Sequence, residues 1–346
     1  MKYVLIADLH CGLKDYSMLV DGIPEHLYFP LLNLRNAAKL AKKEKAILIV
    51  AGDIMHSKTL LHQQVLTEVY ETIKEVSNEV ESYWLLGNHD FHIINSKVYS
   101  YLMGYNIELA TPNDPIRKHD FALVSYSDKE TLIETIKNLE FEGLKLIVSH
   151  FGIEEADLSS SSNYKTGEFS VKDFSSMKDM WIMLGHYHKP QKLTDRMYYI
   201  GSPTITRLSE IGEEKRILLL DTDTNKLESI PTIYPKVSKL VFGKSDKLDI
   251  DHIEESVKNE YTKFILNIPK DYNFMKDAVS LNSKYRGYIN LSFIDEDVNN
   301  KESSDIIDID KIDMNTILSD YQSFKKLEDN IKDKAITKFH QLIKEE

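Results

Sequence analysis

Residues 46–56 read AILIVAGDIMH: six apolar residues end at a glycine and an aspartate, and a histidine follows three positions later. An uninterrupted apolar run of this length, closed by glycine, is typical of a strand buried on both faces of a parallel sheet. Asp53 then stands just beyond the carboxyl end of that strand, which is where open α/β sheets bind their ligands. The stretch therefore predicts an α/β fold with a functional site at a sheet edge.

Four further segments repeat this arrangement, each a short apolar run followed at once by acidic, amide or imidazole side chains. The runs are Tyr3–Ala7, Tyr83–Leu86, Leu144–Val148 and Trp181–Leu184. A lone histidine beside a strand is commonly a hydrogen-bonded structural group, but six of the chain's twelve histidines fall in these five segments. That concentration favours one shared site. The polar segments are Asp8-Leu9-His10, Gly87-Asn88-His89-Asp90, Ser149-His150 and Gly185-His186-Tyr187-His188.

These side chains form a ligand set for borderline divalent cations. Carboxylate, carboxamide and imidazole together suit Mn²⁺, Fe²⁺ or Zn²⁺, and the lone Cys11 argues against a thiolate zinc site. Two cations about 3.5–4 Å apart need one ligand that touches both, and the Asp53 carboxylate is the candidate. A pair of such cations can activate water to hydrolyse a phosphate ester. His89 would then be left to contact the phosphate of the substrate or to protonate the leaving oxygen. The other ligands divide into two shells: Asp8, His10 and one of His186 and His188, then Asn88, His150 and the other histidine.

The order of these motifs resembles the calcineurin-like metallophosphoesterase superfamily. Finer features resemble its SbcD-type branch, the nuclease subunit of a double-strand-break repair nuclease–ATPase complex. His56 falls where that branch has its second histidine, whereas the protein phosphatases of the superfamily have an arginine shortly after Gly-Asp. The runs GHYHKPQ (185–191) and YIGSP (199–203), followed by Glu210 and a strand at Arg216–Asp221, also match. The resemblance covers about residues 1–235 and suggests a compact phage member.

The resemblance implies a calcineurin-like β-sandwich flanked by helices, a small α+β capping domain and a C-terminal helical segment. It implies two Mn²⁺ ions, with Mg²⁺, Fe²⁺ or Zn²⁺ as alternatives. His89 would act on the transition state, and His56 would assist near the scissile phosphate. Cys11 and Met55 depart from the family pattern, but neither is at a ligand position. By this likeness the first metal takes Asp8, His10, Asp53 and His188, and the second takes Asp53, Asn88, His150 and His186.

The pattern predicts four parts along the chain. Residues 1–235 form the metallophosphoesterase domain, and Pro231 and Pro235 flank its end. Residues 236–295 contain three strand-like runs separated by helical stretches, at the position of the family's DNA-capping domain. The segment 296–315 is strongly acidic and is typical of a linker.

Residues 316–346 carry an apolar stripe at helical spacing that includes Tyr321, Phe324 and Phe339. An amphipathic helix tethered by a solvated linker is a candidate for helix-in-groove binding, and the resemblance implies an SbcC-like ATPase as the partner. The alternative is that this helix folds back on its own domain. Helical patterns at 31–45 and 60–80 lie where the resembled family builds a homodimer, which we therefore expect, although packing against the sheet explains amphipathic helices more simply.

A net charge of −12 and a pI near 5.5 are unusual for a chain that binds DNA, because affinity for nucleic acid depends largely on neutralising phosphates. A metal pair would supply local positive charge. Lys189, Lys192, Arg196 and Arg207 are expected to gather near the site, although ordinary surface positions explain them equally well. The negative net charge suggests that a partner supplies much of the affinity for DNA.

The sequence has no apolar run long enough to span a membrane and no signal-peptide pattern at its start. Its single cysteine excludes an internal disulfide and agrees with a reducing compartment. We therefore expect a cytoplasmic protein, in the host cytoplasm if it comes from a phage.

Three functions compete for this sequence. The leading hypothesis is a Mn²⁺-dependent DNA nuclease, with 3′-to-5′ exonuclease action on duplexes and endonuclease action on single strands, that works with an SbcC-like ATPase in DNA end processing, recombination and repair. The alternative is a general two-metal phosphomonoesterase or small-molecule phosphodiesterase. A scaffold that retains only the fold is the third, and the intact ligands at every motif argue against it.

Overall fold

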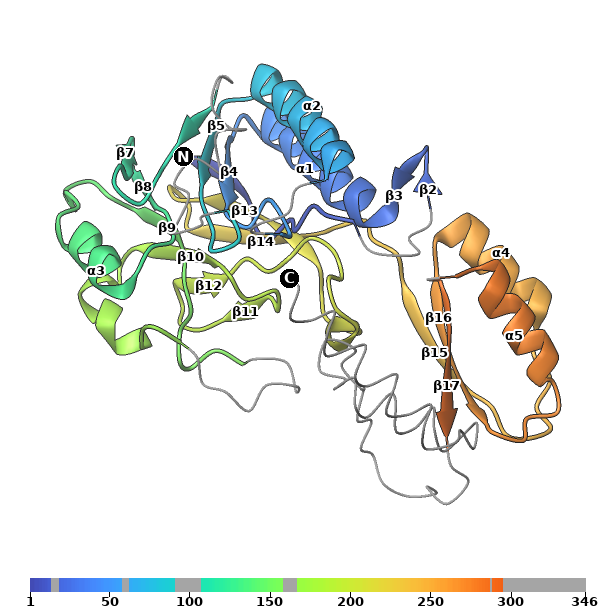
Figure 1. The fold of residues 1–346 in the computed structure, drawn as a ribbon. Helices are drawn as coiled ribbons and strands as arrows, with labels where there is room; N and C mark the ends of the chain where they lie inside the picture. Colours follow the sequence, from blue (N-terminus) through green and yellow to red (C-terminus); the bar gives the residue numbers. More distant parts are fainter. Residues whose placement is uncertain (14–18, 58–61, 91–106, 158–166, 287, 295–346) are drawn as a thin grey trace, which may run out of the picture. The chain divides into compact units, whose positions relative to one another are not determined.

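The computed structural model describes residues 1–294 apart from 14–18, 58–61, 91–106, 158–166 and 287. These residues belong to one compact unit built around two six-stranded sheets that pack face to face (Figure 1). The first sheet has the order β14-β13-β1-β4-β5-β6, with bounds Lys226–Pro231, Arg216–Asp221, Lys2–Ile6, Ile47–Ala51, Ser82–Leu85 and Glu108–Leu109. The second has the order β11-β12-β10-β9-β8-β7, with bounds Gln191–Lys192, Met197–Tyr199, Trp181–Gly185, Leu146–His150, Phe121–Val124 and Ile116–Lys118.

Strand β1 shows why the central strands are apolar without alternation. Its residues Val4 and Ile6 pack beneath the helices on the outer face of the first sheet, and Tyr3 and Leu5 pack between the two sheets. Since both faces are covered, every position of the strand favours an apolar side chain. The expected sandwich flanked by helices is confirmed.

The strand registers bring the polar ends of the strands to the same edge. β1 and β4 are parallel, and Ile6 lies opposite Val50. β9 and β10 are parallel, and His150 lies opposite Gly185. The chain therefore leaves both pairs of strands at matching heights, immediately before the residues that were predicted to bind metal.

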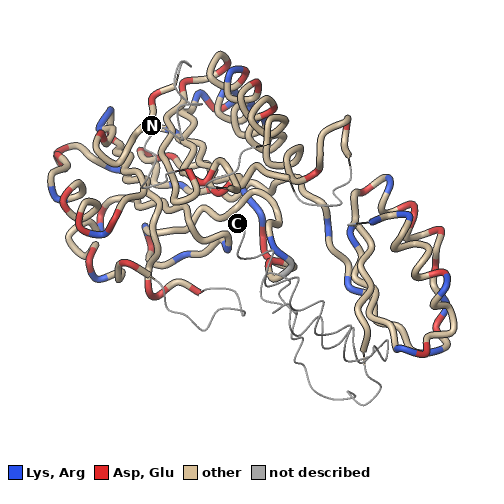
Figure 2. The backbone as a smooth tube through the Cα atoms, viewed as in Figure 1, with Lys and Arg blue, Asp and Glu red and all other residues tan. Residues whose placement is uncertain are grey.

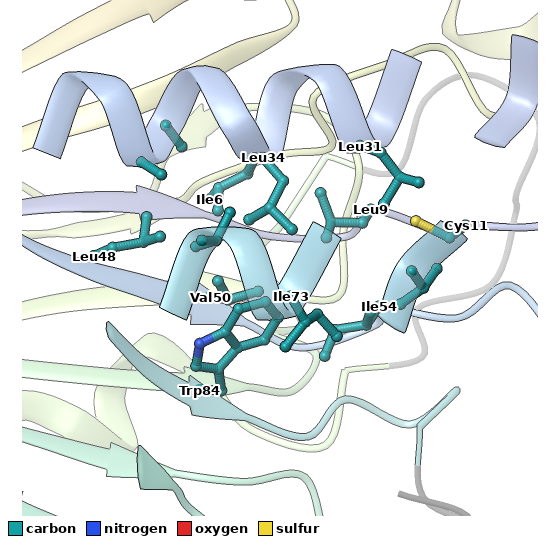
Figure 3. Close-up of a cluster of buried hydrophobic side chains, with 14 of the residues drawn as sticks. Ile6, Leu9, Cys11, Leu31, Leu34, Leu48, Val50, Ile54, Ile73 and Trp84 are labelled. Carbon is teal, nitrogen blue, oxygen red and sulfur yellow. The ribbon is translucent and has the colours of Figure 1, made fainter. Parts of the chain in front are cut away.

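Helices α1 (Glu25–Glu44) and α2 (Gln63–Glu79) cover the outer face of the first sheet. Figure 3 shows Leu34 of α1 near Ile6 of β1 and Ile73 of α2 near Trp84 of β5, within one buried cluster. The amphipathic patterns of both helices thus serve the core of the protein. A homodimer remains a prediction.

Helix α1 begins at Glu25, six residues earlier than its periodicity predicts, and contains Pro30. A proline inside a helix leaves the carbonyl four residues earlier without its N–H donor. Leu27 and Phe29 are buried in this first part of the helix. Burial of such side chains stabilises the fold by about 1.5–3 kcal/mol each, which offsets the cost of the proline.

The outer face of the second sheet is covered by α3 (Lys129–Lys137) and by the 3₁₀ helix η2 (Val171–Met177). The serine-rich, polar composition of 157–176 is typical of a loop, but the end of this stretch belongs to η2. Ser170 and Asp173 cap the helix reciprocally, and Phe174 and Met177 are buried beneath it. Two buried side chains and a cap explain why a serine-rich stretch becomes helical here.

Residues 237–294 alternate strand and helix: β15 (Val237–Val241), α4 (Ile250–Glu260), β16 (Lys263–Pro269), α5 (Met275–Lys284) and β17 (Ile289–Ile294). The strands pair in the order β15-β16-β17, and both pairings are parallel. Both helices pack on one face of this small sheet (Figure 1). Because each connection is a helical crossover, neighbouring strands run in the same direction, and the expected α+β unit has a regular α/β arrangement.

The remaining described elements are the hairpin β2 (Leu19–Val20) and β3 (Ile23–Pro24), and the 3₁₀ turn η3 (Leu208–Glu210). The predicted acidic linker 296–315 and the predicted helical segment 316–346 lie outside the described residues. In the part of the chain that the structure describes, no helix has the length and apolar character needed to cross a bilayer.

Candidate metal centre

The structure brings the polar ends of five strands together at one edge of the two sheets. All seven predicted ligands meet there, and both predicted catalytic histidines lie beside them. His150 differs slightly from the expectation, because it is the last residue of β9 rather than the second residue after it. The converging residues are Asp8, His10, Asp53, Asn88, His150, His186, His188, His56 and His89.

The backbone at the centre is held in an uncommon conformation. Asp8, His10, Asp53 and His186 have φ angles of 54°, 46°, 51° and 97°. Non-glycine residues seldom adopt positive φ, and such strain is commonly found at functional sites. Two backbone hydrogen bonds stabilise it: Asp8 N–H donates to Gly52 O at 3.0 Å, and His10 N–H donates to Asp53 O at 2.9 Å.

Glycine is required where two of the loops approach the ligands. A Cβ atom on Gly87 would lie 2.1 Å from Asp53 Oδ1. A Cβ atom on Gly52, whose φ is +82°, would lie 2.6 Å from His150 Nδ1. Any larger residue at either position would displace a predicted ligand.

One half of the centre is formed by Asp8, His10 and His188, whose ligand atoms all lie within 4.8 Å of one another. His188 Nε2 lies 2.9 Å from His10 Nε2. Asp53 Oδ2 lies 3.4 Å from the same His10 nitrogen. These are the four residues predicted for the first metal.

The other half is formed around Asn88. Its Oδ1 atom lies 3.2 Å from His150 Nε2 and 3.0 Å from His186 Nδ1. Asp53 Oδ2 lies 3.4 Å from His150 Nε2. The Asp53 carboxylate therefore lies between the two halves, at the position that a bridging ligand requires.

The donor set fits a cation. The carbonyl of Ala51 lies 3.0 Å from His150 Nδ1 and accepts its N–H. A neutral imidazole has a single N–H, so the His150 Nε2 lone pair then points at the oxygens of Asn88 and Asp53, which are acceptors themselves. Among the described residues, the buried Asp8 Oδ2 has no hydrogen-bond partner. Lone pairs that converge in this way need a positive charge between them.

The pKa values of the buried groups also indicate that the centre needs a positive charge. Burial raises the pKa of Asp8 to about 6, and burial lowers the pKa of His186 to about 3. Burial also opposes the charged form of His150, but the carboxylates of Asp53 and Asp8 outweigh it and raise the pKa of His150 to about 9. At neutral pH, His150 therefore carries a proton until another cation replaces it.

His89 and His56 lie on one side of the ligands. His89 Nδ1 lies 2.6 Å from the carbonyl of His56, and the backbone N–H of His89 donates to Asp53 Oδ1 at 2.8 Å. The His10 ring lies 4.7 Å from the His89 ring and 5.5 Å from the His56 ring, measured between centroids. One ring nitrogen of His89 is near enough to His10 and Asp53 to be a further ligand candidate, so geometry alone leaves both roles open for it.

Sequence analysis missed the role of Asp90. Its buried carboxylate accepts the backbone N–H groups of Ile54 at 2.9 Å, Met55 at 3.0 Å and Gly87 at 3.1 Å. It therefore joins the loop after Asp53 to the loop that carries the next ligand. An acidic residue beside the Gly87-Asn88-His89 motif was the only available signal, and it does not reveal which backbone groups the side chain will meet.

The expected gathering of basic residues at the centre is wrong for Arg196. Its guanidinium donates to Asn225 Oδ1 at 2.8 Å and lies over the ring of Trp181, at the opposite end of β10 from the metal centre. Lys189 and Lys192 form ion pairs with Asp157 and Asp195. Figure 2 shows basic and acidic residues interspersed along the described chain. Closeness in sequence misled here because the hairpin after β10 carries these residues back along the sheet.

The sequence was also compared with known proteins. The family described as Calcineurin-like phosphoesterase matches residues 1–211. The chain is 20% identical to “Exonuclease subunit 1” of Enterobacteria phage T4 over 341 residues, which cover 93% of this chain and 92% of that protein. It is 23% identical to “Putative phosphoesterase 244L” of Invertebrate iridescent virus 6 over 242 residues, 63% of this chain and 80% of that protein. Among solved structures, an archaeal phosphodiesterase aligns with a TM-score of 0.34 and 15% identity, covering 67% of this chain and 99% of that one.

Proposed function

The chain belongs to the calcineurin-like phosphoesterase family, whose members use divalent metals, and from this premise we propose that it is a Mn²⁺-dependent DNA nuclease. One observation carries the proposal beyond the family. The likeness to the phage exonuclease subunit spans 93% of the chain, whereas the phosphoesterase family match ends at residue 211. The similarity thus includes the small α/β unit at 237–294, for which hydrolysis of a small phosphoester has no evident need.

The residues that would hold the metals are those that converge in the two halves of the centre. Asp8, His10 and His188 would bind one ion, Asn88, His150 and His186 would bind the other, and Asp53 would touch both. A pair of divalent cations supplies charge neutralisation for a phosphodiester and a hydrolytic nucleophile at neutral pH. With four imidazoles among seven ligands, the centre suits Mn²⁺ better than Mg²⁺, which prefers oxygen ligands and keeps its waters.

His89 is the residue that we propose to act on the leaving group. Its Nδ1 lies 2.6 Å from the His56 carbonyl, and donation of the Nδ1 N–H to this oxygen orients the ring. A protonated His89 at the rim of the centre can donate its second proton to the leaving oxygen as the ester bond breaks. His56, which is exposed beside it, is proposed to assist at the scissile phosphate.

The wider assembly is also a proposal. We propose that the segment 316–346 binds an SbcC-like ATPase, that the chain forms a homodimer, and that the complex processes DNA ends in the cytoplasm during recombination and repair. The net charge of −12 supports a need for a partner, because phosphate neutralisation by lysine and arginine carries most of the affinity for DNA.

The proposal is tested by presenting the purified chain with labelled duplex DNA, labelled single-stranded DNA and para-nitrophenyl phosphate, each with Mn²⁺ or Mg²⁺. We expect Mn²⁺-dependent release of nucleotides from duplex 3′ ends, internal cleavage of single strands, and little hydrolysis of the monoester. Rapid hydrolysis of the monoester with both DNAs left intact would contradict the nuclease proposal and favour the general phosphoesterase. Full activity with Mg²⁺ alone would contradict the preference for Mn²⁺.

A further inference from the structure

A buried ion pair lies directly behind one of the candidate metal ligands. The Lys215 and Glu210 side chains are only 0% and 4% exposed, and Lys215 Nζ lies 2.7 Å from Glu210 Oε2. Removing two charges from water costs about as much as the pair regains. A contribution to stability is therefore a weak explanation for this buried ion pair. Its other contacts indicate a role in positioning a neighbouring side chain.

Both oxygens of Glu210 are engaged. Oε1 lies 2.7 Å from His188 Nδ1 and accepts the hydroxyl of Thr206. Oε2 accepts the backbone N–H of Thr206 at 2.9 Å as well as the Lys215 ammonium. Lys215 also donates to Ser202 Oγ at 2.9 Å. Three donors other than His188 thus hold the carboxylate in place, and this leaves Oε1 facing the imidazole of His188.

This contact determines which nitrogen of His188 faces the metal centre. A carboxylate can only accept, so His188 Nδ1 must be the donor in the contact with Glu210. The Nε2 atom then presents its lone pair, and it lies 2.9 Å from His10 Nε2 in the half of the centre formed with Asp8. Partners of this kind orient the ligands of metal sites and select their tautomer.

We propose that Glu210, held in place by Lys215, is a positioning residue that fixes the ring and the tautomer of His188 for the Asp8–His10 half of the centre. This inference rests on the metal centre of the proposed function. The second half of the centre has a different support, because the Ala51 backbone carbonyl orients His150. Loss of the Glu210 carboxylate should therefore weaken the binding of one ion and leave the other unchanged.

Glu213 provides a matched control. Its carboxylate lies 3.3 Å from the same Lys215 ammonium, but within the described part of the chain it is not hydrogen-bonded to His188. Glu213→Gln removes the same charge from the same lysine and leaves the imidazole contact intact. Thr206→Val removes the hydroxyl that donates to Glu210 and that also lies 2.7 Å from His188 Nδ1. It leaves the Glu210 carboxylate in place, so it is a milder variant should Glu210→Gln fail to fold.

The first measurement is a Mn²⁺ titration of the full chain, in which free Mn²⁺ is followed by electron paramagnetic resonance. The wild type should bind two ions, and Glu213→Gln should bind both of them with the same affinities as the wild type. Glu210→Gln should bind one ion normally and the other about 10–100-fold more weakly, and Thr206→Val should weaken the same ion to a smaller degree. Unchanged binding of both ions by folded Glu210→Gln, or equal weakening of both, would overturn the proposal.

The second measurement uses the metal-free chain and reports the tautomer directly. The ¹⁵N chemical shifts of the His188 ring should show a protonated Nδ1 in the wild type and a mixture of tautomers in Glu210→Gln. Identical ring shifts in the two proteins would overturn the positioning role. A wild type that binds no Mn²⁺ would instead overturn the proposed metal centre, and the ring shifts distinguish that failure from a failure of the Glu210 proposal.

Discussion

Asp53 Oδ2 lies 3.4 Å from His150 Nε2, and its other oxygen accepts the backbone N–H of His89 at 2.8 Å. The same Oδ2 lies 3.4 Å from His10 Nε2, in the other half of the centre. One carboxylate thus contacts both groups of candidate ligands and the loop that carries the proposed acid. The bridged metal centre depends on this arrangement.

Replacement of His89 by asparagine should leave the metals bound and slow DNA cleavage by about 10²–10⁴-fold, the usual contribution of a positioned proton donor. Metal content and the single-turnover cleavage rate check this on the same preparation. His252→Asn, on the exposed surface of α4, is the control. Loss of an ion with an unchanged rate per filled site would show that His89 is a ligand.

Binding of Mn²⁺ at pH 7 should release about one proton per chain, because metal ligands must be deprotonated. The carboxylates around His150 raise its pKa to about 9 against the effect of burial, so the metal-free chain holds that proton at pH 7. The affinity should therefore increase as the pH rises from 7 toward 9 and then level off. Calorimetric titrations in buffers of different ionisation enthalpy measure the release, and heats that are independent of the buffer would refute it.

Asp90→Asn should lower the free energy of unfolding by about 1–3 kcal/mol, the cost of leaving buried hydrogen-bonding groups unsatisfied. An amide has one acceptor oxygen where the carboxylate has two, and its NH₂ group would face the backbone donors of Ile54, Met55 and Gly87. Denaturant unfolding of the metal-free chain gives the value. Stability equal to that of the wild type would mean that Asp90 does not join the two loops.

Removal of residues 316–346 should abolish copurification with an SbcC-like ATPase and leave Mn²⁺-dependent cleavage by the remaining chain largely intact. All the proposed ligands lie before residue 190, so the chemistry does not need this segment. In the full chain, Phe324→Ser on the apolar stripe should weaken the complex, whereas its neighbour Lys325→Ser should not. Undiminished copurification of the truncated chain would assign the segment to the chain's own fold.

Much of the fold could be predicted because the strands of the two sheets are short, fully buried and closed by polar residues. The apolar runs at 46–51 and 181–184 correspond to β4 and β10. The helical period at 31–45 matches the later part of α1, and the period at 60–80 contains all of α2. The structure also brings the predicted ligands together, since the carboxyl ends of parallel strands meet at one edge. Their roles as ligands remain predictions.

The sequence could not reveal features that depend on contacts between distant residues. Edge strands such as β6 and β11 have two residues each, too few to show a period. The beginning of α1 depends on burial of Leu27 and Phe29, which outweighs Pro30. The contact between Glu210 and His188 joins residues 22 positions apart and leaves no periodic trace. Arg196 was misplaced for the opposite reason, because nearness along the chain does not mean nearness across a hairpin.

The most direct test of the account is the number of Mn²⁺ ions bound by the wild type and by Asp53→Ala, measured beside DNA cleavage on the same preparations. If Asp53 bridges the two halves, the wild type binds two ions and cleaves DNA. The variant then loses the paired binding and all measurable cleavage, because Asp53 Oδ2 lies 3.4 Å from a candidate ligand in each half. Two ions still bound by Asp53→Ala, or cleavage at the wild-type rate, would contradict the bridged centre on which the proposed function depends.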